Sequence, residues 1–373
     1  MKQIYLLIKP ASSLCNMRCL YCFYTDVSTK RELPNNGIML RQTANKIIEN
    51  TFKDLAEGDE ITFGFQGGEP TLAGLSWFMD FIAKVKAQRQ KTTVNYSLQT
   101  NGLLLDEEWC KFLHENNFLV GLSVDGVERF HDNYRLDTQG RSTYREVMKR
   151  KELLEKHSVE YNILCVLTND LAGDPDRIWR FILREKIRFI QFIPCLDTLE
   201  EQQPSRYTLR PARFAAFYSR LFRLWEQELE TGHYVSVKFF DDIAHFFFRN
   251  IPNACGITGK CQPQYVIEAD GKVYPCDFYA LDEYSTGNLA EQTLREIFYS
   301  EKMQCFLKDS PPLPGTCEKC FYYKACMGGC KRMRNVMYCS QDGTICGYKT
   351  FLDKCLKPLE RSLHRLSSGN SLL

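Results

Sequence analysis

The stretch "SSLCNMRCLYCFY" at residues 12–24 places Cys15, Cys19 and Cys22 within eight positions. It directly follows "IYLLIK" (4–9), the first strand-like apolar run of the chain. A closed tetrahedral thiolate site takes four ligands, and no fourth cysteine lies near these three in the sequence. Three thiolates would hold a [4Fe–4S] cube with one iron open to another ligand. An open metal position is typical of a catalytic site, whereas a closed one is typical of a structural site.

Five more strand candidates follow in the first 195 residues and alternate with amphipathic segments. Strands are predicted at 61–66, 94–99, 118–124, 161–167 and 189–194, and helices near 41–56, 75–90, 106–116, 143–157 and 175–186. This alternation indicates an α/β fold of parallel βα units, closed as a barrel or open as a doubly wound sheet. In either case ligands bind at the carboxyl ends of the strands. The cysteine stretch, "GGEP" (67–70), "TNG" (100–102), "DG" (125–126) and "CLD" (195–197) all follow strands, so an active site is expected there.

Composition excludes several classes of function. The chain has 48 basic and 46 acidic residues, so its net charge of +2 indicates neither a nucleic-acid surface nor an anionic membrane as partner. Its apolar runs are too short to cross a bilayer, and "MKQIYLLIKP" (1–10) lacks the features of a signal peptide. The cytosol disfavours disulfides, and seventeen cysteines cannot all pair. We therefore expect a cytoplasmic protein whose thiolates bind metal.

Cysteines are concentrated in the C-terminal third of the chain, where eleven of them fall between Cys255 and Cys355. Before them, residues 209–250 are predicted to form one or two bridging helices. A β-hairpin is predicted around Asp270 and Gly271, then loops at 317–346 and a helix at 347–366. We expect domains at 1–235 and 236–373. Two closed sites of four thiolates each could be formed by eight of the later cysteines: Cys255, Cys261, Cys276, Cys317, Cys320, Cys326, Cys330 and Cys346. Spacing alone does not exclude zinc as the metal at these sites.

The pattern C-x3-C-x2-C followed by an aromatic residue resembles the signature of the radical S-adenosylmethionine enzymes, and "GGEP" resembles a second motif of that family. The alternative interpretation is a zinc knuckle or three unrelated core cysteines. The resemblance implies a partial (β/α)6 barrel in which the open iron chelates the methionine moiety of S-adenosylmethionine. One electron then cleaves the sulfonium and releases a 5′-deoxyadenosyl radical. The cofactor contacts that the resemblance implies, or that the strand ends suggest, are Tyr21, Tyr24, Gln66, Gly68, Glu69, Gln99, Ser123, Arg135 and Leu196.

The later cysteines resemble the SPASM extension of the same superfamily, which holds two auxiliary [4Fe–4S] clusters. The resemblance assigns Cys255, Cys261, Cys276 and Cys330 to the first cluster, and Cys317, Cys320, Cys326 and Cys346 to the second. Cys339 and Cys355 compete with Cys346 for the last position, and "CGYKTF" (346–351) favours Cys346. The six cysteines without a ligand role are expected to be buried small hydrophobes: Cys110, Cys165, Cys195, Cys305, Cys339 and Cys355.

Six segments spread over almost the whole chain resemble the anaerobic sulfatase-maturating enzymes: "LLIKPASSLCNMRCLYCFY", "FGFQGGEPTLAGL", "SLQTNG", "FLVGLSVDG", "QFIPCLD" and "VYPCDFYALD". That family oxidises a cysteine or serine in a Cys/Ser-x-Pro-x-Arg segment of a sulfatase to Cα-formylglycine. The chemistry needs a base and an electron acceptor close together. Asp277, directly after Cys276, occupies the position that the family uses as general base. Without the resemblance, an aspartate in a loop would be interpreted as a turn cap or a solvated charge.

Two other functions compete with this interpretation. The first is a SPASM enzyme that forms a thioether or carbon–carbon crosslink on a ribosomal peptide. Many such enzymes carry an N-terminal peptide-recognition domain, which we do not expect here because the radical core begins within a dozen residues of Met1. The second is a non-catalytic zinc-ribbon interaction protein. The sulfatase interpretation implies a nascent or unfolded sulfatase chain as partner, a flavodoxin or ferredoxin as electron donor, and a monomer.

Overall fold

The computed structural model describes residues 2–89, 91–199, 205–340 and 342–368. They form two compact units, each assembled from separate parts of the chain. Unit 1 consists of Met1–Ser123, Tyr134–Tyr161 and Gln262–Asp309, and unit 2 of Val124–Asn133, Asn162–Cys261 and Ser310–Leu373. In the described part of the chain, no helix has both the length and the apolar character that a membrane span requires.

Unit 1 contains a sheet built on four parallel strands: β1 (Gln3–Ile8), β2 (Glu60–Phe65), β3 (Thr93–Thr100) and β4 (Phe118–Ser123). They lie side by side in chain order, with Leu7 opposite Gly64 and Gly64 opposite Ser97. One face of each strand carries fully buried apolar residues such as Phe63 and Leu98. Because side chains alternate along a strand, the neighbours of these residues face the other side of the sheet.

A β-hairpin from the C-terminal half of the chain extends this sheet beyond β1. Strands β8 (Val266–Ile267) and β9 (Lys272–Tyr274) are antiparallel, and β10 (Gly287–Asn288) pairs with β9. Strand β8 runs parallel to β1, and the amide of Lys9 donates a hydrogen bond of 2.8 Å to the carbonyl of Ile267. The hairpin predicted around Asp270 and Gly271 is confirmed, and it places residues 266–279 in the same unit as the N-terminal cysteines.

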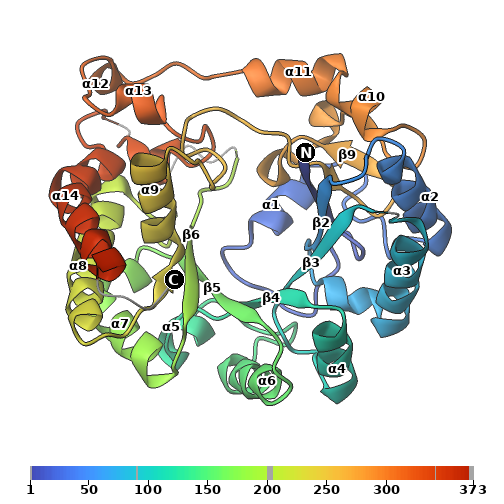
Figure 1. The fold of residues 1–373 in the computed structure, drawn as a ribbon, viewed down its shortest axis with the longest axis horizontal. Coiled ribbons are helices and arrows are strands. Elements are labelled where there is room, and N and C mark those ends of the chain that lie inside the picture. The colour runs from blue at the N-terminus through green and yellow to red at the C-terminus, as the bar shows by residue number, and fades with distance from the viewer. Residues whose placement is uncertain (1, 90, 200–204, 341, 369–373) are drawn as a thin grey trace. The chain divides into compact units, whose positions relative to one another are not determined.

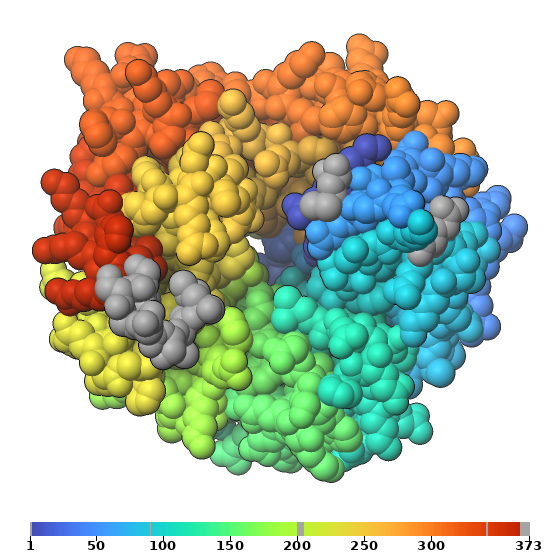
Figure 2. All heavy atoms as spheres, viewed as in Figure 1, coloured from blue at the N-terminus to red at the C-terminus, as the bar shows by residue number. Residues whose placement is uncertain are grey.

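Helices α2 (Arg41–Phe52), α3 (Leu75–Gln88), α4 (Glu107–Glu115) and α6 (Tyr144–Lys156) lie along the outer side of the unit 1 strands (Figure 1). Figure 2 shows the outer side of this layer, blue to teal, as a continuous surface of side chains. Local sequence sets where helices begin: the carboxylate of Asp106 accepts a hydrogen bond from the amide of Trp109 at the start of α4. The helices are α1 (Phe23–Thr29), α2 (Arg41–Phe52), α3 (Leu75–Gln88), α4 (Glu107–Glu115), α6 (Tyr144–Lys156), α10 (Leu294–Phe298) and α11 (Glu301–Lys308), with short 3-10 turns η1 (Pro70–Ala73), η3 (Asp277–Tyr279) and η4 (Asp282–Tyr284).

Unit 2 contains strands β5 (Tyr161–Leu167), β6 (Phe189–Pro194) and β7 (Ser236–Val237), which pair in parallel. Helix α8 (Pro211–Glu230) packs against α14 (Gly347–Ser368), as Figure 1 shows in yellow and red. The stretch between Cys317 and Cys346 holds only short elements, as predicted for loops around metal. The remaining elements are α5 (Glu128–Asp132), η2 (Leu171–Gly173), α7 (Pro175–Arg184), α9 (Lys238–Arg249), α12 (Gly315–Glu318), α13 (Tyr323–Cys326) and the π-turn η5 (Arg334–Tyr338).

The six predicted strands β1 to β6 and the five predicted helices between them are all present, with ends that differ by a few residues. The predicted bridge at 209–250 forms two helices, α8 and α9, and the predicted C-terminal helix is α14. Periodicity was sufficient here because each element is amphipathic or fully apolar in its own sequence.

Candidate functional site

The carboxyl ends of β1, β2 and β3 carry a row of polar side chains in unit 1. Ile8 pairs with Phe65, and Phe65 with Leu98, so the following residues Lys9, Gln66 and Gln99 share one level and one face of the sheet. Gln66 and Gln99 are half-buried, whereas Lys9 is 1% exposed. The structure therefore brings two of the predicted cofactor contacts together beside a buried lysine that the sequence analysis did not single out.

The three-cysteine loop lies against the turn that follows β2. Cys22 immediately precedes α1, and the sulfur of Cys15 accepts a hydrogen bond of 3.4 Å from the amide of Met17. The amides of Gly68 and Glu69 donate to the carbonyls of Ser12 and Leu14. A Cβ atom at Gly68 would lie 2.0 Å from the Leu14 carbonyl oxygen, so only glycine allows this approach. The "GGEP" turn thus supports the loop that carries the proposed ligands.

The carboxylate of Glu69 joins the ends of β2 and β3. It is 1% exposed and accepts hydrogen bonds from the amide and hydroxyl of Thr71, the hydroxyl of Thr100 and the amide of Asn101. Burial raises the pKa of the Glu69 carboxyl, while these hydrogen bonds act to lower it. Because its oxygens are engaged within the protein, we expect the "GGEP" backbone to supply the cofactor contact predicted at Gly68 and Glu69.

Asp277 lies at the centre of a hydrogen-bonded cluster in unit 1. Its Oδ2 accepts hydrogen bonds from the hydroxyl of Tyr24 (2.5 Å) and from Nε2 of Gln66 (2.9 Å). Gln66 Nε2 also contacts the Tyr24 hydroxyl. Burial and the charge of Asp277 raise the pKa of Tyr24 well above its ordinary value, so the phenol stays protonated at neutral pH and can only donate to Asp277. Tyr24 thereby connects the predicted base to the loop of Cys22, two positions earlier.

A second layer of charge lies behind Asp277. The ammonium of Lys9 is 3.1 Å from Asp277 Oδ1 and 3.3 Å from Glu268 Oε1, which also accepts from Arg31 at 2.7 Å. All four side chains are at least nine-tenths buried, and two cations balance two carboxylates. Burial alone would raise the pKa of Glu268, but Lys9 and Arg31 outweigh it and hold that pKa below its ordinary value. The buried carboxylate of Asp277 thus has a cation beside one oxygen and two hydrogen-bond donors on the other.

Three more of the predicted cofactor contacts also lie in unit 1. Residues 134–136 hydrogen-bond to the cysteine loop, because Arg18 and Leu20 donate amide protons to the carbonyls of residues 136 and 134. As a result the guanidinium of Arg135 lies 5.7 Å from the centre of the Tyr21 ring. Ser123 is the buried last residue of β4.

Leu196, the remaining predicted cofactor contact, belongs to unit 2. It is a buried residue two positions after the end of β6. Its role remains a prediction.

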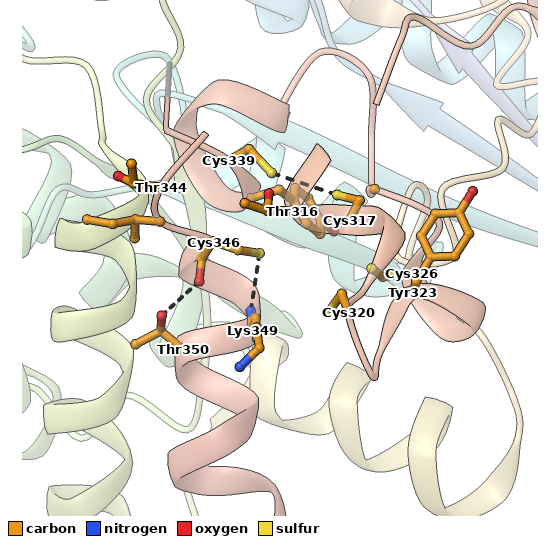
Figure 3. A pocket seen from close by; sticks show the side chains of 13 residues that line it. Thr316, Cys317, Cys320, Tyr323, Cys326, Cys339, Thr344, Cys346, Lys349 and Thr350 are labelled. Atoms are coloured by element: carbon orange, nitrogen blue, oxygen red, sulfur yellow. Dashed lines mark hydrogen bonds between the residues drawn. The ribbon is translucent and has the colours of Figure 1, made fainter. Parts of the chain in front are cut away.

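Unit 2 contains a pocket of about 400 Å³ at the second predicted auxiliary site. Cys317, Cys320, Cys326 and Cys346 all line it, and so does Cys339 (Figure 3). A single tetrahedral ion has its ligands about 2.3 Å away, so a space of this size suits a larger group such as an iron–sulfur cube. The described residues contain no group of three or more His, Cys, Asp or Glu side chains arranged to hold one metal ion.

The first predicted auxiliary set is divided between the two units. In unit 2, a Cβ atom at Gly256 would lie 2.6 Å from Cβ of Cys330, so Cys255 and Cys330 come from segments in close contact. Cys261 is the last residue of its segment of unit 2. Cys276 belongs to unit 1, where it directly precedes Asp277 at the start of η3.

The six cysteines without a predicted ligand role do not all behave as expected. Cys110, Cys165, Cys195 and Cys355 are buried, as predicted. Cys305 is exposed on α11, because it lies on the side of this amphipathic helix opposite the buried Met303 and Phe306, so that prediction is wrong. Cys339 is buried but faces the pocket of the second auxiliary site. Cys355, on α14, does not line that pocket.

Lys9, Arg31 and Glu268 were not predicted from the sequence, although two of them carry a signal there. Lys9 ends the apolar run "LLIK", and Glu268 follows the buried pair Val266 and Ile267. A charge at the end of a buried strand is unusual unless it has a partner. Which charges would pair could not be foreseen, because the partners meet only through the pairing of β1 with β8.

Comparisons with known proteins agree with this geometry. A family model described as the radical SAM superfamily matches residues 10–182, and one described as an iron–sulfur cluster-binding domain (SPASM) matches residues 259–321. A cysteine-type anaerobic sulfatase-maturating enzyme of Clostridium novyi is 40% identical over 96% of this chain and 97% of its own length. A cysteine-type enzyme of Clostridium perfringens is 42% identical over 90% of both chains. A serine-type enzyme of Bacteroides thetaiotaomicron is 30% identical over 89% of this chain and 84% of its own.

Solved structures show the same relationship. Native anSMEcpe with bound AdoMet and Kp18Cys peptide superposes with a TM-score of 0.89 at 36% identity, covering 97% of this chain and 99% of the other. Streptococcus suis SuiB bound to the precursor peptide SuiA has a TM-score of 0.65 at 14% identity and covers 92% of this chain and 76% of its own, which is a likeness of fold alone. The fold class predicted from the sequence is confirmed.

Proposed function

The chain belongs to the anaerobic sulfatase-maturating enzymes, radical S-adenosylmethionine oxidoreductases that generate Cα-formylglycine, and on that premise we propose that its preferred target is a cysteine and its general base is Asp277. The preference for cysteine is supported by the identities: 40–42% to cysteine-type relatives against 29–30% to serine-type ones. The substrate is a sulfatase segment of the form Cys-x-Pro-x-Arg.

The observation that carries the assignment of the base is the environment of the Asp277 carboxylate. When bound, S-adenosylmethionine and its cluster supply the 5′-deoxyadenosyl radical that takes a hydrogen atom from the β-carbon of the target. Asp277 would accept the thiol proton, and the remaining electron would pass to an auxiliary cluster held by the later cysteines. Water would then hydrolyse the thioaldehyde to the aldehyde and release hydrogen sulfide. The ammonium of Lys9 lies 3.1 Å from Oδ1 of Asp277, and Tyr24 and Gln66 hold its Oδ2 through hydrogen bonds.

The proposed ligands and contacts are those of the sequence analysis. Cys15, Cys19 and Cys22 hold the open cluster, and the eight later cysteines hold two closed ones, which makes about twelve irons from three cubes. The packing of Gly68 under the cysteine loop and the thiol-lined pocket of unit 2 support these sets. We propose that the cofactor is contacted by Tyr21, Tyr24, Gln66, Gly68, Glu69, Gln99, Ser123, Arg135 and Leu196.

The remaining assignments concern organisation and partners. Residues 1–235 form the radical core with its bridging helices, and residues 236–373 form the SPASM domain. The enzyme works as a monomer in the cytoplasm. The reducing environment of that compartment protects its seventeen cysteines from oxidation. It acts on nascent or unfolded sulfatase and receives electrons from a flavodoxin or ferredoxin.

The function is tested by anaerobic incubation of the iron-loaded protein with S-adenosylmethionine, a reductant and matched peptides that contain Cys-x-Pro-x-Arg or Ser-x-Pro-x-Arg. We expect 5′-deoxyadenosine together with an aldehyde on the peptide, formed faster from cysteine. Faster oxidation of serine would overturn the preference for cysteine. Formation of 5′-deoxyadenosine with an unmodified or crosslinked peptide would overturn the sulfatase assignment itself.

A further inference from the structure

Five thiols surround the pocket of the second auxiliary site, one more than a closed cluster requires. Cys317, Cys320, Cys326, Cys339 and Cys346 all line it. Figure 3 shows the side chains of Cys339 and Cys317 directed toward each other. The pocket therefore raises the question of what the extra thiol does.

Cys339 is held between two of the predicted ligands. It follows the π-turn η5 and forms an antiparallel β-bridge with Cys346. Its sulfur lies 3.9 Å from that of Cys317, within the range of an S–H···S hydrogen bond. The side chain is 2% exposed, so water does not compete for the thiol proton.

The distance between Cys339 and Cys317 is too short for two ligands of one cube. Two sulfurs bound to the same tetrahedral ion at about 2.3 Å are roughly 3.8 Å apart. Sulfurs bound to different irons of a cube point outward from different corners, and so lie farther apart. Cys317 forms a Cys-x2-Cys pair with Cys320, which leaves Cys339 as the extra thiol.

Cys346 is the better fourth ligand because its position favours a thiolate. It immediately precedes α14, and its sulfur accepts a hydrogen bond of 3.4 Å from the amide of Lys349 (Figure 3). A helix N-terminus stabilises negative charge through its amide groups and its dipole. Cys355 lies further along α14 and is not among the residues that line the pocket.

We propose that Cys339 does not coordinate iron but donates its S–H hydrogen bond to a ligand sulfur beside it, that of Cys317 or Cys346, and so raises the reduction potential of the second auxiliary cluster. Reduction adds negative charge to a cluster and its ligand sulfurs, and a hydrogen bond to a ligand sulfur stabilises that charge. The inference rests on the proposed three-cluster function and adds a residue that tunes one of the clusters.

The test compares Cys339→Ala, Cys339→Ser and Cys346→Ala with the matched control Cys355→Ala. Iron and zinc per chain are measured in the full-length anaerobic protein. Potentials are measured by EPR-monitored titration in a background where Cys15, Cys19 and Cys22 are alanine, so that only auxiliary clusters respond. We expect about twelve irons in the wild type and in the variants of Cys339 and Cys355, and about four fewer in Cys346→Ala.

The potential of one auxiliary cluster should fall in Cys339→Ala and return toward the wild-type value in Cys339→Ser, whose hydroxyl can still donate. Cys355→Ala should leave both potentials unchanged. Loss of iron from Cys339→Ala with retention in Cys346→Ala would show that Cys339 is the ligand and overturn the inference. An unchanged potential in Cys339→Ala, or stoichiometric zinc, would overturn it as well. About eight irons in the wild type would instead overturn the three-cluster proposal.

Discussion

The ammonium of Lys9 lies 3.1 Å from Oδ1 of Asp277, and both residues are almost fully buried. One directly follows the first strand of the chain, and the other follows a cysteine of the C-terminal iron–sulfur region. The pairing of β8 with β1 brings them together. It places a cation directly beside the buried carboxylate that we propose as the base.

Replacing Asp277 with asparagine removes the proton acceptor and keeps the shape of the side chain. We expect about twelve irons and wild-type binding of S-adenosylmethionine, with formylglycine formation lowered at least about a hundredfold, in the range that general bases contribute. Mass spectrometry of the peptide measures the product. Asp282→Asn is the matched control, because Asp282 accepts a hydrogen bond from the amide of Glu32 outside this cluster. Full activity of Asp277→Asn would refute its role as base.

Lys9→Met should leave two buried carboxylates with one cation fewer. We expect a loss of about 3–5 kcal/mol in the free energy of unfolding, as for a broken buried ion pair. Lys84→Met removes an exposed ion pair with Glu49 and should cost less than about 1 kcal/mol. Anaerobic urea unfolding of both iron-loaded variants makes the comparison. Equal urea midpoints for Lys9→Met and Lys84→Met would contradict a stabilising role of the buried Lys9 ion pairs.

Tyr24→Phe deletes the hydroxyl that donates to Asp277 and leaves the ring. A hydrogen bond to a charged group contributes about 1.5–3 kcal/mol, so kcat/KM should fall roughly tenfold to a hundredfold. Initial rates with the cysteine peptide measure this effect. The exposed Tyr299 provides the control variant, Tyr299→Phe, which should be as active as the wild type.

Glu268→Gln should change how stability depends on pH. Because Lys9 and Arg31 hold the pKa of Glu268 below its ordinary 4.5, the ionised carboxylate stabilises the folded protein above that pH. The contribution is lost as the pH falls through the lowered pKa. We therefore expect the free energy of unfolding of the wild type to exceed that of Glu268→Gln by a constant margin from pH 7 to about 5, and this margin to shrink below about pH 4.5. Urea unfolding of both proteins at each pH measures the margin. A stability difference that grows as the pH falls would contradict a lowered pKa for Glu268.

Gly68→Ala should disrupt the open cluster selectively. The added methyl would meet the Leu14 carbonyl and displace the cysteine loop. We expect about four irons fewer than in the wild type, with the auxiliary clusters retained. Gly315→Ala serves as the control, because nothing lies within 4 Å of a Cβ atom there. Iron analysis with EPR measures the result, and an unchanged iron content would show that the loop tolerates the shift.

Much of the fold could be predicted because its signals are local. The strands β1 to β6 and the helices between them follow from runs of apolar residues with period 2 or 3.6. The three-cysteine loop is also local, since Cys15, Cys19 and Cys22 lie in one short segment and can converge without any distant contact. The division of the chain into units was not foreseen in detail: residues 262–309 pack with the N-terminal unit because β8 joins β1.

By itself, the sequence determined the element order, the spacing of the cysteines and, through its motifs, the family and the chemistry. Only the tertiary structure decided which distant side chains meet. Lys9 became the partner of both Glu268 and Asp277 through the pairing of β1 with β8, and Cys339 became a neighbour of Cys317 through its bridge to Cys346. The physical reason is that local patterns fix backbone conformation, whereas a buried charge or thiol takes its role from neighbours that only strand pairing and chain closure supply.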